Sequence, residues 1–137
     1  MGHFYFIIHT WVAGIAYYYA RGRRSFIESL TVDHLVVGIG LFGLWNFIGH
    51  PLMSEQIAQS IGWTSNGFQQ ELGWVSLGIG IAGLLCFWIR DRFWWATAIP
   101  FSTFLLGAAG IHLVEIMEKG NLNPGNTWII MPDLLMP

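Results

Sequence analysis

Four ionisable residues, each at the end of a strongly apolar segment, have types and spacing that could support chemistry. They are His50, Glu71, His112 and Glu115. His112 and Glu115 are three positions apart, so on a helix they lie one turn apart on the same face. Ionisable groups at membrane depth are costly, and they usually face a bundle interior or a watery cavity. The four residues are therefore a candidate functional site, provided that the apolar segments span a membrane.

Two further polar residues lie near the same level of the apolar segments. Asn46 precedes His50 by four positions, so the two share one face of the second segment. His9 lies near the outer half of the first segment and is a supporting candidate. If the segments cross a bilayer, all six residues reach one layer on one side of it. We expect inward rotation of the helices to bring them together.

Three hypotheses account for such a layer, and the residues alone leave all three open. Two imidazoles and two carboxylates could coordinate zinc, iron or copper, although the paired Glu-x-x-His repeat of di-iron bundles is absent. The same groups could bind a polar headgroup such as a quinone carbonyl, or carry protons, because histidine titrates near neutral pH. Alternatively, the glutamates pair with the histidines and hold the helices together as a satisfied polar clamp.

The composition favours a membrane protein. The chain has 137 residues, of which 54% are hydrophobic and only 10% are charged. Soluble domains carry about 25% charged residues, so this chain has too few to cover a surface that faces water. Its net charge of −2 and the absence of a basic run give no reason to expect a nucleic-acid partner. The single cysteine, Cys86, cannot form an internal disulfide.

Four apolar runs must position the candidate residues, and each is long enough to cross a bilayer. We predict one all-α domain over residues 1–137, an integral membrane four-helix bundle. Its spans are expected at about 4–20, 31–50, 68–89 and 93–118. A short outer-surface helix is predicted over 54–60, ending near Gly62. The remaining residues begin with turn chemistry and are predicted to lie back on the outer surface as an amphipathic tail.

The basic residues predict the orientation. Five of the six lie in two loops that must share one side of the membrane: Arg21, Arg23, Arg24, Arg90 and Arg92. Because cytoplasmic loops carry an excess of Lys and Arg, both loops are predicted to be cytoplasmic. Both termini and the loop between the second and third spans are then outside, and the candidate layer lies in the outer leaflet.

Small residues recur along three of the predicted spans and predict close helix packing. They are Gly38, Gly40 and Gly43 in the second span, Gly78, Ala82 and Cys86 in the third, and Gly107 and Gly110 in the fourth. Small residues at such spacing let helix backbones approach each other closely in lipid.

Motifs spread over about 41–126 resemble those of a known family. In chain order they read GLWNFIGHPLM, IGW, FQQELGWVSLGIGIAGLL, GAAGIHLVEI and NPGN. The series resembles an uncharacterised family of short four-span prokaryotic membrane proteins, a domain of unknown function. More distantly, Glu-Leu-Gly and Gly-Ala-Ala-Gly-Ile-His are similar to DoxX-like membrane proteins, which include the small subunit of a thiosulfate:quinone oxidoreductase. The matching residues are Gly49, His50, Trp63, Glu71, Gly73, His112, Pro124, Gly125 and Asn126.

The resemblance implies a prokaryotic cytoplasmic membrane and no established activity. We expect a small accessory or structural subunit of a larger membrane complex, because small and aromatic residues occupy more helix faces than one small bundle buries. Its partners would be the lipid bilayer and other membrane subunits, or further copies of the chain. The alternative is a metal-binding or quinone-linked redox protein that uses the His/Glu layer. No catalytic motif decides whether the protein is an enzyme.

Overall fold

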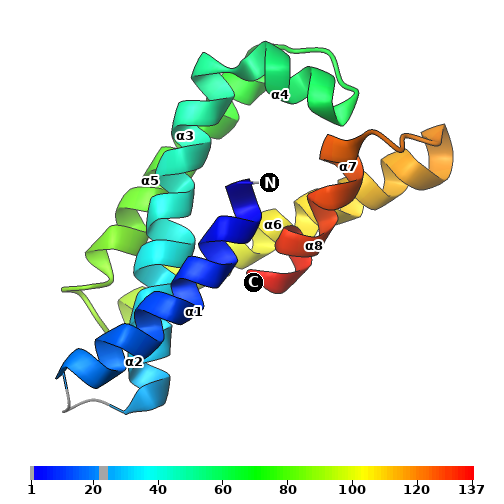
Figure 1. The fold of residues 1–137 in the computed structure, drawn as a ribbon. Helices are drawn as coiled ribbons and strands as arrows, with labels where there is room; N and C mark the ends of the chain where they lie inside the picture. Colours follow the sequence, from blue (N-terminus) through cyan, green and yellow to red (C-terminus); the bar gives the residue numbers. More distant parts are fainter. Residues whose placement is uncertain (1, 22–24) are drawn as a thin grey trace.

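The computed structural model describes residues 2–21 and 25–137, with the side chains of residues 8–20 and 25–137. Within these residues the chain is helical and contains no strand, which confirms the predicted all-α class. The elements, in chain order, are α1 (Gly2–Arg21), α2 (Phe26–Asp33), the π-helical η1 (His34–Leu41), α3 (Phe42–Leu52), α4 (Ser54–Ile61), α5 (Gly67–Leu85), α6 (Arg92–Lys119), α7 (Pro124–Trp128) and α8 (Ile130–Leu135) (Figure 1).

Elements α2, η1 and α3 follow one another as a single helix of 27 residues, Phe26–Leu52. It begins about five residues before the predicted span because Ser25 caps it: the Ser25 hydroxyl accepts a hydrogen bond of 3.1 Å from the Glu28 N–H. This helix and α6 are both long and apolar enough to cross a membrane. That finding gives weak support for a membrane location.

Helix α5 packs closely against the second long helix, and glycines make the contact possible. A Cβ at Gly43 would lie 2.6 Å from the Gly80 Cα, and one at Gly83 would lie 2.5 Å from the Gly40 nitrogen. The predicted close approach is confirmed, but α5 uses Gly80 and Gly83 for it. A Cβ at Gly78 would meet nothing within 4 Å, so that residue faces away from the contact.

Helix α6 begins beside α5 and then diverges from α3 and α5 (Figure 1). At the point of divergence an ion pair of 2.7 Å joins Arg90, in the connection before α6, to Glu28 of α2. The connection after α5 and the start of α2 therefore lie at the same end of the molecule. Arg23, Arg24 and the Arg21 side chain, which also entered the predicted orientation, lie outside the described residues.

Beyond the α5–α6 connection, the short helices bridge the separated ends of α3 and α6. Helix α4 follows α3 almost without a break and ends at Gly62, whose φ of 85° lies in the left-handed region. The predicted helix over 54–60 and its end near Gly62 are thus confirmed. In Figure 1 α4 extends from the end of α3 toward α7, which begins shortly after α6 ends.

The tail does not remain at the far end of α6, and the predicted position on the outer surface is wrong in this respect. Helices α7 and α8 turn back along α6 until the Pro137 carbonyl oxygen lies 3.5 Å from the Ser102 hydroxyl (Figure 1). Ser102 is about 25 Å along α6 from Lys119. The return is favourable because the tail buries apolar surface: Met136 is 2% exposed and joins the core formed by Leu35, Ile39, Phe42, Cys86, Phe101 and Leu105.

Candidate functional site

A cavity of about 840 Å³ lies between α3, α4, α6, α7 and α8. Most of its wall is apolar, and the largest side chains in it are aromatic: Phe42, Trp45, Phe104 and Trp128. Small-molecule sites in proteins have about 300–1,000 Å³ and are mostly apolar, with a few polar groups that orient the ligand. The cavity has the size and the lining of such a site.

Four side chains with an amide, imidazole or carboxyl group interrupt the apolar wall. Asn46 and His50 come from α3, His112 from α6 and Asp133 from α8. Asn46, His112 and Asp133 are buried, and Asp133 is only 3% exposed. Three helices that are distant in sequence therefore direct polar groups to one cavity.

Two of these polar groups lack a partner. Within the described part of the chain, neither the His50 Nδ1 atom nor the Asp133 Oδ2 atom has a hydrogen bond, although both are shielded from solvent. Most buried polar side-chain atoms in native proteins are paired with protein groups or ordered water. The two atoms at this cavity are therefore able to pair with a polar group of a ligand.

Burial also changes the acidity of Asp133. Desolvation raises the pKa of its carboxyl group from the ordinary 3.8 to about 7, because the apolar surroundings disfavour the charged form. The carboxyl group can therefore change its protonation state near neutral pH. No Lys or Arg side chain belongs to the described cavity wall, so no fixed positive charge there offsets the charge of Asp133.

The hydrogen bonds of Asn126 fix the tautomer of His112. Asn126 Nδ2 donates to the carbonyl oxygens of His112 and Asn121, at 3.2 and 2.9 Å. Its Oδ1 therefore faces His112 Nδ1, 2.7 Å away, and must accept a hydrogen bond from the N–H group at that nitrogen. In the neutral imidazole, Nε2 then carries the lone pair. The Trp63 ring stacks on the imidazole at 5.4 Å between centroids and 12° between planes, which holds the ring in place.

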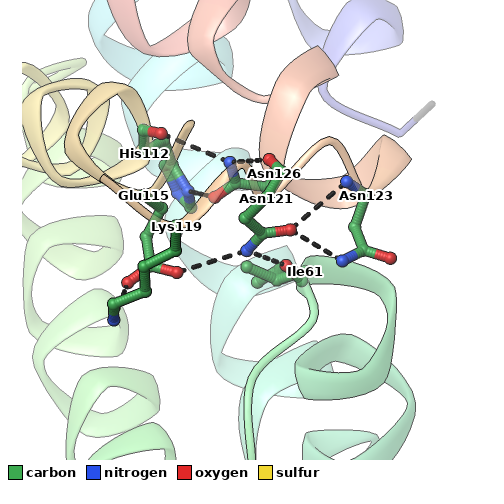
Figure 2. A network of polar contacts seen from close by, with 7 residues as sticks. All are labelled: Ile61, His112, Glu115, Lys119, Asn121, Asn123 and Asn126. Atoms are coloured by element: carbon green, nitrogen blue, oxygen red, sulfur yellow. Dashed lines mark hydrogen bonds and ion pairs between the residues drawn. The ribbon is translucent and has the colours of Figure 1, made fainter. Parts of the chain in front are cut away.

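A group of contacts that we call the α4–α7 clasp joins the end of α4 to the turn before α7. It consists of Ser60, Ile61, Asn121, Asn123 and Gly125 (Figure 2 shows three of them). Asn121 Nδ2 donates to the Ile61 carbonyl at 2.9 Å, and Asn123 Nδ2 donates to Asn121 Oδ1 at 2.6 Å. A Cβ at Gly125 would lie 2.5 Å from the Ser60 carbonyl oxygen, so only glycine allows this approach.

Glu115 contacts the clasp and does not line the cavity. Its Oε2 accepts a hydrogen bond of 3.3 Å from Asn121 Nδ2, and its Oε1 pairs with Lys119 one turn further along α6 (Figure 2). Lys119 is 66% exposed, so this ion pair contributes little to stability. Glu115 therefore helps to position the turn that closes the cavity.

The structure brings together only part of the predicted layer. His50, His112 and Asn46 line the cavity, whereas Glu115 is hydrogen-bonded to Asn121 of the clasp. Glu71 and His9 are exposed and do not line the cavity. Glu71 faces away because Gly73, two positions later, is pressed against Pro51 of α3, and two positions correspond to about 200° around a helix.

Two residues of the site were not expected from the sequence. Asp133 was missed because the tail was placed on the surface, where a carboxylate needs no explanation. A signal was present: Asp133 is the one charge in the otherwise apolar stretch IIMPDLLMP. Asn126 was matched to the family motif without a role, and its role depends on contacts with α6 that the sequence does not show.

The described side chains do not form a metal site by themselves. No three His, Cys, Asp or Glu residues among them are grouped so that they could hold a metal ion. The separation of Glu71 from the two histidines explains this, because the predicted ligand set needed both carboxylates on the same side.

A comparison with protein families matches the whole chain, residues 1–137. The chain belongs to a family of unknown function (DUF6790). The resemblance to an uncharacterised family is thus confirmed, whereas the likeness to DoxX-like proteins and the four-span arrangement are not. Comparisons with curated proteins and with solved structures found no match. The motif NPGN of this chain supplies Gly125 of the clasp and Asn126, the hydrogen-bond partner of His112.

Proposed function

We propose that this protein binds a small amphipathic molecule within a membrane, in the cavity between α3, α6 and α8. The observation that carries the proposal is the combination of an apolar cavity of about 840 Å³ with two buried, unpartnered polar atoms, on His50 and Asp133. An apolar portion of the ligand would contact the aromatic wall. Its polar head would satisfy the two atoms, which otherwise each cost free energy by remaining buried and unpaired.

The membrane arrangement is part of the proposal. Four spans, formed by α1, the Phe26–Leu52 helix, α5 and α6, would cross a prokaryotic cytoplasmic membrane with both termini outside. The basic loops would be cytoplasmic, as the positive-inside rule favours. The Arg90–Glu28 pair supports this arrangement, because it holds the starts of α2 and α6 at one end of the molecule.

The position of the tail also supports a site at membrane depth. Short helices and irregular backbone are tolerated within the hydrocarbon region only where they are buried in protein or line a cavity. Helices α7 and α8 meet this condition, because residues of both line the cavity and Met136 lies in the core. The tail would then be a re-entrant segment that forms one wall of the binding site.

A cavity-filling variant tests the proposal. Ala108 lines the cavity, so Ala108→Phe places an aromatic ring where the ligand would lie. Leu106 is on the same helix, is 51% exposed and does not line the cavity, so Leu106→Phe is a matched control that adds an aromatic ring outside it. The measurement is native mass spectrometry of protein released from mild detergent, with and without added single-chain amphiphiles.

We expect wild type and Leu106→Phe to carry one amphiphile per chain, and Ala108→Phe to lose it while retaining the same melting temperature within a few degrees. The proposal is wrong if wild type binds no amphiphile, or if Ala108→Phe binds as well as wild type. A variant that fails to fold is recognised by its melting curve, and Ala108→Leu then replaces it.

A second candidate function, that of an accessory subunit, is favoured by one observation. A Cβ at Gly78, Gly107 or Gly110 would meet nothing within 4 Å, so these small residues face outward from α5 and α6. Outward small residues are suited to close contact with another helix in lipid. Purification in mild detergent should then recover a larger assembly that Gly107→Leu weakens. A monomer at all protein concentrations would contradict this role and leave the ligand site unaffected.

A further inference from the structure

Two polar groups of the cavity, on Asp133 and His112, can accept hydrogen bonds from a positively charged group. Asp133 supplies a carboxyl group, and this residue is only 3% exposed to solvent. His112 supplies an Nε2 lone pair, because its Nδ1–H donates a hydrogen bond to Asn126 Oδ1. No described Lys or Arg lines the wall, so the cavity has no fixed positive charge to attract an anion.

The aromatic part of the wall has the same preference. Trp45 and Trp128 both line the cavity, and the faces of Trp rings attract cations within about 6 Å. An anionic headgroup would instead meet the Asp133 carboxylate and would be repelled. The polar and aromatic groups of the cavity therefore favour a ligand whose headgroup is positively charged.

We propose that the ligand of this cavity is a lipophilic amine, an apolar chain or ring system with a protonated amino head that pairs with Asp133 and donates to His50 or His112. This inference rests on the proposed function, which requires only that an amphiphile binds. The amine proposal adds the chemical class of the ligand's headgroup, and it names Asp133 as the residue that selects this class. The ammonium group supplies the hydrogen-bond donor that the Asp133 Oδ2 atom lacks.

The titratable groups around Asp133 determine how pH acts on this pairing. His50 and His112 face the cavity from α3 and α6, and His34 of η1 lies near the end of α8, beside the Met136 backbone. Raising the pH from 6 to 8 ionises Asp133, whose pKa lies at about 7, while an alkylamine with a pKa near 10 stays protonated. Amine binding should therefore strengthen over this range.

The test uses three probes that differ only in their heads. Dodecylamine, dodecanol and dodecanoate are titrated by calorimetry into the full chain in phosphatidylcholine nanodiscs at pH 8, with empty nanodiscs as the background. The test variant is Asp133→Asn, which is isosteric and removes the charge. Glu71→Gln is the matched control, because Glu71 is an exposed carboxylate outside the cavity.

We expect dodecylamine to bind at least about tenfold more tightly than dodecanol, and dodecanoate to bind most weakly. Asp133→Asn should remove this preference and leave dodecanol binding within about twofold, and Glu71→Gln should behave as wild type. Equal binding of all three probes, or an amine preference that survives Asp133→Asn, would overturn the amine proposal while the amphiphile site stands. Absence of binding by all three probes would instead refute the proposed function itself.

Discussion

The clearest structural prediction concerns Asn126, which connects the tail to α6. Its side chain is fully buried and makes three hydrogen bonds, one to His112 Nδ1 and two to the carbonyl oxygens of His112 and Asn121. Each such bond contributes about 1 kcal/mol, and the buried groups that Asn126→Ala leaves behind cannot all reach water. Asn126→Ala should therefore weaken the attachment of the tail by about 3 kcal/mol.

Hydrogen exchange measures this loss directly. A local opening that becomes about 3 kcal/mol easier exposes its amides roughly 100-fold more often, so the backbone of 124–137 should exchange about 100-fold faster. The amides of α5, which do not contact Asn126, should keep their rates and serve as an internal reference.

Asn123→Ala is the matched control, because Asn123 is exposed and its side-chain amide has one bond, of 2.6 Å, to Asn121. We expect that variant to change tail exchange by no more than about threefold. If Asn126→Ala left the exchange of the tail within threefold of wild type, or if Asn123→Ala had the same effect, the role assigned to Asn126 would be refuted.

Two further predictions concern packing and pH. Gly125→Ala should destabilise the protein by about 1–3 kcal/mol in thermal melts, because its Cβ would lie 2.5 Å from the Ser60 carbonyl oxygen. Gly107→Ala, whose Cβ meets nothing within 4 Å, should instead stabilise α6 by up to about 1 kcal/mol. If Gly107→Ala destabilised the protein as much as Gly125→Ala, this account of the packing would be contradicted. Because the pKa of Asp133 is raised from 3.8 to about 7 in the folded protein, the folded state binds the extra proton, and stability should fall as pH rises between these values. Asp133→Asn should remove that part of the fall while Glu71→Gln does not, as melts from pH 4 to pH 8 would show.

The sequence predicted the helical elements well, because their signals are local. Apolar runs located α5 and α6 to within a few residues, and Gly62 ended α4 as expected. The start of the second long helix was placed too late because Ser25, its cap, precedes the apolar run. Two of the predicted helices are long and apolar enough to cross a membrane, which gives weak support for a membrane location.

The composition of the candidate site was predicted only in part, because it depends on how each helix is rotated. His50 and His112, two of the predicted residues, both line the cavity. Glu71 was assigned to the same group from its depth alone. The glycine face of α5 that packs on α3 turned it outward, and no property of Glu71 itself indicates that rotation.

By itself, the sequence determined that the protein is helical, that its long helices are suited to lipid, and that two histidines lie near their ends. The tertiary structure decided which polar groups share a cavity. It brought Asp133 from the last helix into the wall and tied Asn126 to His112, because the tail gains more by burying Met136 against the core than by remaining in water. Local patterns specify helices, whereas the contacts that bring the tail back to α6 arise between residues far apart in the chain.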